Sequence, residues 1–186
     1  PRLTGCQLPA QGIECLLRVH AQVQHVDQHL EMRLRLHVAA HDAKAAVQHA
    51  LARGHGGDDR VVGPLGTLQG IGTFLREVKP QIKIVAVEPR NAASLLGREP
   101  GLHVIQGIGD GFVPDVLDKN LVDTVITVSD DDAVETTRLL AKDEGLLVGT
   151  SSGANVWAAL QMDNGRNRIV TVLPDRAERY FSTALI

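Results

Sequence analysis

The chain has 186 residues, enough to bury a sizeable core in one domain, or in one domain and part of another. Hydrophobic residues make up 44% and charged residues 22%, as in a soluble globular protein, and a net charge of -3 gives no electrostatic case for binding nucleic acid or an anionic membrane. Aromatic residues, at 3%, are too scarce for base-stacking platforms, and no stretch approaches the roughly 20 apolar residues of a membrane helix. Cys6 and Cys15 match neither a zinc site nor a disulfide framework, which favours a reduced, cytoplasmic setting.

Residues 1–62 carry only local structural signals. Glu31–Val38 alternates polar and apolar side chains as a half-buried strand does, and Asp42–Arg53 has the pattern of a capped helix. Seven of the eight histidines lie in this part of the chain. The composition changes near Gly63, so residues 1–62 and residues 63–186 are expected to be separate units.

Beyond Gly63, predicted strands and helices alternate. The strands are expected over Ile82–Val87, Thr124–Val128, Leu146–Gly149 and Ile169–Leu173. The helices are expected over about Thr67–Val78, from Ser129 or Asp130 to Gly145, over Ala154–Leu160, and over Glu178–Leu185. This alternation predicts an α/β fold with a mostly parallel sheet and helices on both faces.

The most informative segment is Gly149-Thr150-Ser151-Ser152-Gly153, where a predicted strand turns into a helix. In open α/β sheets, ligands bind outside the carboxyl ends of the strands, and two hydroxyls there can reach a ligand. Serine is also a preferred helix N-cap. The pattern alone therefore leaves two interpretations of Ser151 and Ser152, ligand binding and helix capping.

Two glycine-containing turns are further candidates. Gly63-Pro64-Leu65-Gly66-Thr67 precedes a predicted helix, as phosphate-binding turns do. Its proline supplies no N–H and its leucine resists positive φ angles, so an ordinary turn is the alternative. In Gln106–Gly111, glycines at alternate positions let a ligand approach the backbone, but no strand–turn–helix unit supports a dinucleotide site.

No metal site is predicted. His25 with His29, and His37 with His41, have the i,i+4 spacing of two ligands on one helix face, but no HExxH motif or further ligand accompanies them. Surface histidines are the favoured interpretation. The three acids Asp130–Asp132 stand at a helix start, where negative charge complements the helix dipole, and are expected to be structural.

Four segments resemble the C-terminal part of the cysteine synthase (O-acetylserine sulfhydrylase) family of pyridoxal-phosphate (PLP) enzymes. They are GTLQGIGTFLREVKPQIKIVAVEP, PGLHVIQGIGDGFVPDVLD, EGLLVGTSSGAN and LPDRAERYFSTALI, and they span residues 66–186, about two-thirds of the chain. Cystathionine β-synthase shares much of this framework, although PGLHVIQGIG and ERYFSTALI look more like the sulfhydrylases. The resemblance implies the fold-type-II, tryptophan synthase β-like architecture, in which the cofactor lies between a small N-terminal and a larger α/β domain. Residues 63–186 would be part of the larger domain.

The resemblance also implies roles for single residues. Gly63, Gly66 and Thr67 fall on the family's Gly-Thr-Gly-Gly-Thr phosphate loop, and Ser151 falls on the serine that hydrogen-bonds the cofactor's pyridine nitrogen. A neutral hydroxyl does not hold a proton on the ring as a carboxylate would, so electron withdrawal is moderate, which suits β-elimination. Four residues match the loop beside the amino-acid substrate: Gln106, Gly107, Ile108 and Gly109.

The implied reaction converts O-acetylserine and sulfide to cysteine and acetate. It needs a lysine that forms a Schiff base with the cofactor and carries the proton. In the family this lysine lies upstream, in a Ser-x-Lys-x-Arg context that no lysine of this chain has: Lys44, Lys79, Lys83, Lys119 and Lys142. No catalytic residue is therefore assigned, and the chain is expected to be truncated and inactive by itself.

Residues 1–62 resemble nothing in the family, and we hypothesise that they are read out of frame. Two alternatives to a cysteine synthase homologue stay open: a cystathionine β-synthase-like enzyme, and a non-catalytic fragment that keeps the groove for the C-terminal tail of serine acetyltransferase. Family members are usually homodimers, and the alternative for a chain that lacks the small domain is exposed apolar surface and aggregation.

Overall fold

The computed structural model describes residues 16–21, 32–37, 59–164 and 168–183, the first two ranges as backbone only. Strands β1 (Leu16–Ala21) and β2 (Met32–His37) form a separate antiparallel pair. The strand predicted over Glu31–Val38 is thus confirmed. The helix predicted over Asp42–Arg53, and three of the four paired histidines, His25, His29 and His41, lie outside the described residues.

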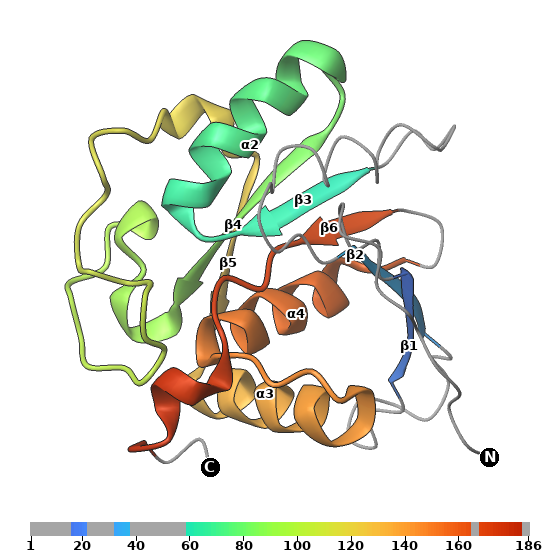
Figure 1. The fold of residues 1–186 in the computed structure, drawn as a ribbon. Helices are drawn as coiled ribbons and strands as arrows, with labels where there is room; N and C mark the ends of the chain where they lie inside the picture. Colours follow the sequence, from blue (N-terminus) through green and yellow to red (C-terminus); the bar gives the residue numbers. More distant parts are fainter. Residues whose placement is uncertain (1–15, 22–31, 38–58, 165–167, 184–186) are drawn as a thin grey trace.

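The main sheet has four parallel strands in the order β5-β4-β3-β6 (Figure 1). They are β3 (Arg60–Gly63), β4 (Lys83–Pro89), β5 (Thr124–Val128) and β6 (Ile169–Thr171). Central strand β3 was not predicted, because its two buried apolar side chains, Val61 and Val62, are too few to give a periodic pattern. The predicted mostly parallel sheet is confirmed.

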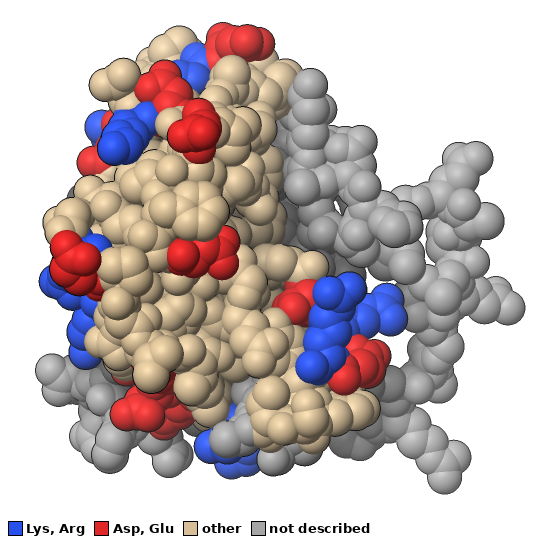
Figure 2. Space-filling view, turned by 90° about the vertical axis from the view of Figure 1, so that its left-hand side faces the viewer, with Lys and Arg blue, Asp and Glu red and all other residues tan. Residues whose placement is uncertain are grey.

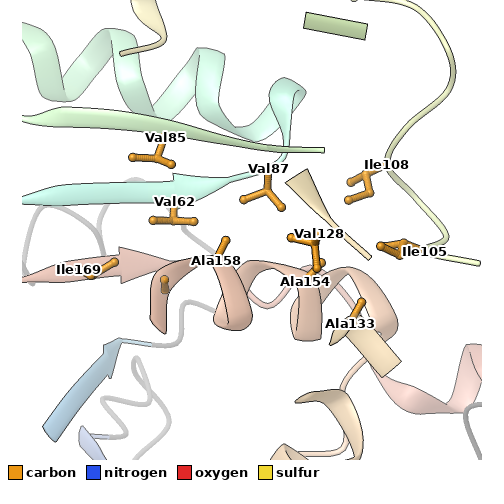
Figure 3. Packing of buried hydrophobic residues seen from close by; sticks show 11 residues of the cluster. Val62, Val85, Val87, Ile105, Ile108, Val128, Ala133, Ala154, Ala158 and Ile169 are labelled. Carbon is orange, nitrogen blue, oxygen red and sulfur yellow. The ribbon is translucent and has the colours of Figure 1, made fainter. Parts of the chain in front are cut away.

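Each face of the sheet packs against a helix. On one face, Leu68, Ile71 and Leu75 of α2 (Leu65–Val78) contact Val61 and Ile84. On the other face, alanines of α4 (Thr150–Met162) pack against the strands (Figure 3). Ala154 and Ala158 lie in one core cluster with Val62, Val85 and Val87. Small side chains on α4 allow the helix to lie close to the sheet.

Helix α3 (Asp130–Glu144) forms an outer layer on α4 (Figure 1). The Ser129 hydroxyl accepts the Asp132 N–H at 3.2 Å, and the helix ends at Gly145, whose φ is 70°. Three aspartates, Asp130–Asp132, occupy the first turn. The predicted limits of this helix and the place of the three acids in its first turn are confirmed.

Three predicted elements differ in the structure. Leu146–Gly149 is not a strand of the sheet, because it joins two helices stacked on the same face; it makes only one antiparallel bridge, between Val148 and Arg176. Strand β6 ends at Thr171 because its neighbour β3 ends one residue after their last pair. The C-terminal helix is only a 3-10 turn, η4 (Ala177–Tyr180).

Between β4 and β5 the chain forms a long connection. It contains three short 3-10 turns, η1 (Arg90–Ala92), η2 (Ser94–Leu96) and η3 (Lys119–Leu121). None of the helices in the described part of the chain is long and apolar enough to cross a membrane.

Candidate functional site

The strand order predicts a ligand-binding crevice at the carboxyl ends of the neighbouring strands β3 and β6. Helix α2 follows β3 on one face of the sheet, and α4, which leads into β6, packs on the other face. The two helix starts are therefore expected on opposite faces at the carboxyl ends of these strands, which is where open α/β sheets bind ligands. A Cβ atom on Gly63, at the end of β3, would lie 3.6 Å from Cγ2 of Val172, next to β6.

One wall of the crevice is the predicted phosphate loop, residues 63–67, at the start of α2. Pro64 is the N-cap, and its carbonyl accepts the first helical hydrogen bond, from the N–H of Leu68 at 3.0 Å. The N–H groups of Leu65, Gly66 and Thr67 precede that bond and have no partner within the helix. Nothing lies within 4 Å of a Cβ atom placed on Gly66, and the first turn holds no acidic residue. This helix start fits a phosphate group.

The opposite wall is the serine segment, residues 149–153, at the start of α4. Ser151 is 3% exposed, and it lies three residues before Ala154 on the helix face that packs against the sheet. Its hydroxyl therefore lies at the carboxyl edge of the strands. A buried hydroxyl at this edge is a suitable hydrogen-bond partner for a heteroaromatic nitrogen.

Ser152 does not cap α4, and the capping interpretation is wrong. The helix begins at Thr150, and its N-cap is Gly149, which has no side chain to offer. Ser152 lies inside the helix, where its N–H donates to the Gly149 carbonyl at 3.0 Å. Its hydroxyl is fully buried and has no hydrogen-bond partner among the described residues.

Asn155 joins the serine segment to the end of β6. Its Nδ2 donates to the carbonyl oxygen of Val172 at 2.9 Å, while its Oδ1 is buried without a partner in the described structure. Cγ2 of Val172 also lies 3.6 Å from the place where a Cβ atom on Gly63 would stand, so Val172 lies between the two walls. We did not predict Asn155 as a site residue, although it ends the recognisable segment EGLLVGTSSGAN.

A second contact holds the serine segment from the C-terminal side. The Gly149 N–H donates to the Asp175 carbonyl oxygen at 3.3 Å, and the Tyr180 hydroxyl donates to Asp175 Oδ2 at 2.5 Å. Burial, and then the neighbouring Asp175 carboxylate, raise the pKa of Tyr180 to about 12. Tyr180 therefore keeps its proton and remains a donor at neutral pH.

The predicted substrate loop, Gln106–Gly109, has an exposed tip and an anchored base. Gln106 and Gly107 are exposed, while Ile108 is 8% exposed and packs in the same core cluster as Ala154. Gly109 has a φ of 77°, and its carbonyl lies 3.0 Å from Nε2 of His103. The loop is thus fixed beside the core cluster that contains Ala154 of α4 (Figure 3).

The described lysines lie away from this crevice. Lys79 pairs with Asp59 at 2.5 Å, and Lys83 begins β4, so both lie toward the amino ends of the strands. Lys119 is exposed in η3, and Lys142 is exposed on α3, while Lys44 lies outside the described residues. Within the described ranges, no three histidine, cysteine or acidic residues form a group that could hold a metal.

Comparison with known proteins links this geometry to a cofactor. Residues 59–175 match the family model described as pyridoxal-phosphate dependent enzyme. Among curated proteins, a cysteine synthase of Staphylococcus aureus is 47% identical over 127 residues, which are 67% of this chain and 41% of that protein. The chain therefore spans less than half the length of the curated relatives it matches.

Solved structures of related enzymes also match the fold of this chain. O-acetylserine sulfhydrylase isoform 3 of Entamoeba histolytica superposes with a TM-score of 0.71 and 38% identity, over 76% of this chain and 44% of that one. An O-acetylserine-dependent cystathionine β-synthase of Helicobacter pylori superposes with a TM-score of 0.66 and 36% identity, over 76% of this chain and 47% of that one. The chain therefore belongs to the family of pyridoxal-phosphate-dependent enzymes, and its likeness within that family is to the cysteine synthases.

Proposed function

We propose that this chain provides the cofactor-holding part of a cysteine synthase-like β-replacement enzyme. The phosphate loop would bind the phosphate of PLP, Ser151 the ring nitrogen, and Gln106–Gly109 the amino-acid substrate. The overall reaction would convert O-acetylserine and sulfide to cysteine and acetate. The observation that carries the proposal is an open helix start after β3 together with a buried serine at the start of α4, a helix whose Asn155 is hydrogen-bonded to Val172 beside Gly63.

The residues of the crevice suit this cofactor chemically. Bound PLP would supply an electron sink for loss of the substrate's α-proton and acetate group. The free N–H groups of residues 65–67 and the helix dipole would neutralise its phosphate. Ser151 would orient the ring without holding a proton on its nitrogen. Pro64 removes one N–H donor from the loop, so we expect phosphate binding to be weaker than with glycine there.

The lysines in the described part of the chain supply no covalent anchor at the crevice. Lys79 is paired with Asp59 at the opposite edge of the sheet. We therefore expect the isolated chain to bind the cofactor without a covalent bond and to have no turnover. Borohydride reduction after mixing with PLP, followed by mass spectrometry, should leave the described lysines unlabelled. A labelled lysine in stoichiometric yield would contradict this part of the proposal.

Expectations about partners and location form part of the same proposal. The side of the molecule that carries the β4–β5 connection has few charged side chains (Figure 2), and Leu102, Val104, Phe112 and Val116 are exposed on that connection. Exposed apolar surface of this kind is typical of an interface. We propose that further protein covers it in a cytoplasmic homodimer, and that the tail of serine acetyltransferase competes with the substrate. A cystathionine β-synthase-like enzyme would differ in its second substrate.

Binding of pyridoxine 5′-phosphate tests the proposal, because this PLP analogue has no aldehyde to react with surface lysines. We expect saturable binding by fluorescence or calorimetry, and inorganic phosphate should compete. Ser151→Ala should weaken binding about tenfold, the effect of one lost hydrogen bond to a ligand. Ser152→Ala, at the adjacent buried position, is the matched control and should leave affinity unchanged. Equal affinity of Ser151→Ala and wild type would refute the assignment of Ser151.

A further inference from the structure

We propose that Tyr180 and Asp175 are positioning residues for Ser151. They lie in the C-terminal segment of the described chain, which runs beside the start of α4 (Figure 1). This inference rests on the proposed function, because it assigns them to orienting the hydroxyl that binds the ring nitrogen.

A backbone contact joins the C-terminal segment to the residues before α4. Residues 147–149 and 175–177 run antiparallel beside each other. The Ala177 N–H donates to the Leu147 carbonyl at 3.2 Å, and the Gly149 N–H donates to the Asp175 carbonyl at 3.3 Å. Val148 and Arg176 complete the bridge between them. The C-terminal segment therefore fixes the backbone that leads into α4.

The side-chain contact depends on Gly149. A Cβ atom there would overlap Oδ1 of Asp175 and lie 2.5 Å from Cε2 of Tyr180, so both side chains pack directly against the glycine backbone. Gly149 is the N-cap of α4 and cannot cap the helix with a side chain of its own. The Asp175 carboxylate lies beside this N-cap and puts negative charge near the positive end of the helix.

Tyr180 fixes that carboxylate. Its side chain is 2% exposed, and its hydroxyl donates to Oδ2 of Asp175 at 2.5 Å. With Oδ2 held by Tyr180, Oδ1 faces Gly149 and has no hydrogen-bond partner in the described part of the chain. Ser151 is the second residue of the helix that this pair holds, so the direction of its hydroxyl follows from the placement of the helix start.

Tyr180→Phe is the informative variant, because it keeps the ring and removes only the donor. Hydrogen–deuterium exchange should show faster uptake over residues 146–153 and unchanged uptake over α2. Affinity for pyridoxine 5′-phosphate should fall about threefold to tenfold, the effect of one displaced hydrogen bond, while affinity for inorganic phosphate should not change. Phe181→Leu, at the exposed neighbouring position, is the matched control for both measurements.

The Ser151→Ala background separates positioning from general structural support. There, Tyr180→Phe should cause no further loss of pyridoxine 5′-phosphate affinity. An equal loss in both backgrounds, or unchanged exchange over residues 146–153, would overturn the positioning role. If wild type binds the analogue and Tyr180→Phe binds it equally well, only this inference fails. If wild type does not bind the analogue at all, the proposed function itself fails.

Discussion

Asn155 donates a 2.9 Å hydrogen bond to the carbonyl oxygen of Val172, and the side chain of Val172 in turn lies against Gly63. This short chain of contacts connects helix α4, the end of β6 and the phosphate loop. It lies at the carboxyl ends of β3 and β6, where open α/β sheets bind ligands. The distance between the predicted phosphate and ring-nitrogen sites therefore depends on buried core contacts.

Replacing Asn155 should destabilise the fold. Asn155→Ala would leave the buried Val172 carbonyl without its donor, and we expect the free energy of unfolding to fall by about 1–3 kcal/mol. Urea unfolding followed by circular dichroism measures this change. Asn120→Ala, at an exposed position in η3, is the control and should stay within about 0.5 kcal/mol of wild type. Equal stability of the two variants would show that the Asn155 bond does not hold α4 to β6.

Gly153 allows α3 and α4 to approach closely. A Cβ atom there would overlap Oγ1 of Thr137 and the carbonyl oxygen of Ala133. Gly153→Ala should therefore cost about 2 kcal/mol or more, because the helices must separate. Gly70→Ala on α2 is the matched control, since nothing lies within 4 Å of its Cβ position, and it should be neutral or stabilising by about 0.5–1 kcal/mol. The midpoint of thermal unfolding of both variants separates the steric overlap at Gly153 from the higher helix propensity of alanine.

Glu88 should make stability depend on pH. Its side chain is 2% exposed and accepts the Leu95 N–H, and burial raises its pKa above the ordinary value of 4.5. The folded state thus binds this proton more tightly than the unfolded state. The resulting stabilisation is complete below about pH 4.5 and is lost as pH rises through the raised pKa.

The test compares wild type with Glu88→Gln, which cannot titrate. The free energy of unfolding of wild type minus that of the variant should increase as pH is lowered from neutral toward 4.5. Glu77→Gln, at an exposed position on α2, reports the effect of removing one surface charge. A wild-type advantage that shrinks on acidification would contradict the direction of the pKa shift.

Pro64 should limit the affinity of the phosphate loop. Pro64→Gly adds a backbone N–H at the start of α2, and we expect affinity for inorganic phosphate to rise about threefold. Pro80→Gly, an exposed proline beyond the other end of α2, controls for the added chain flexibility. Calorimetric titration of both variants checks this. Unchanged or weaker binding by Pro64→Gly would show that phosphate does not contact this end of the loop.

Elements with strong local signals could be predicted from the sequence. Helix α3 has a serine cap at one end and a glycine at the other, and both operate as expected: Ser129 accepts the Asp132 N–H, and Gly145 adopts a left-handed conformation. Strand β5 matches its predicted limits because a β-branched apolar run specifies it. In these places local chemistry and tertiary packing favour the same structure.

Tertiary contacts explain what was missed. Leu146–Gly149 has the composition of a buried strand, but it pairs only with a segment near the C-terminus. The sequence made Ser152 a plausible helix cap, but the N-cap of α4 is Gly149, which packs against Asp175 and Tyr180. Residues 26 to 31 positions apart in the chain make these contacts, and local patterns do not record them. The roles of Gly63, Gly66, Thr67, Ser151 and Gln106–Gly109 came from the family resemblance and remain predictions.

A crystal structure of the chain with pyridoxine 5′-phosphate tests the central claim most directly. The account predicts the phosphate at the N–H groups of residues 65–67 and the ring nitrogen within about 3 Å of Oγ of Ser151, an ordinary hydrogen-bond distance. The ring should lie beside Val172, with the Gln106–Gly109 loop at the substrate side. A ligand bound elsewhere, or a ring nitrogen with no contact to Ser151, would contradict the account.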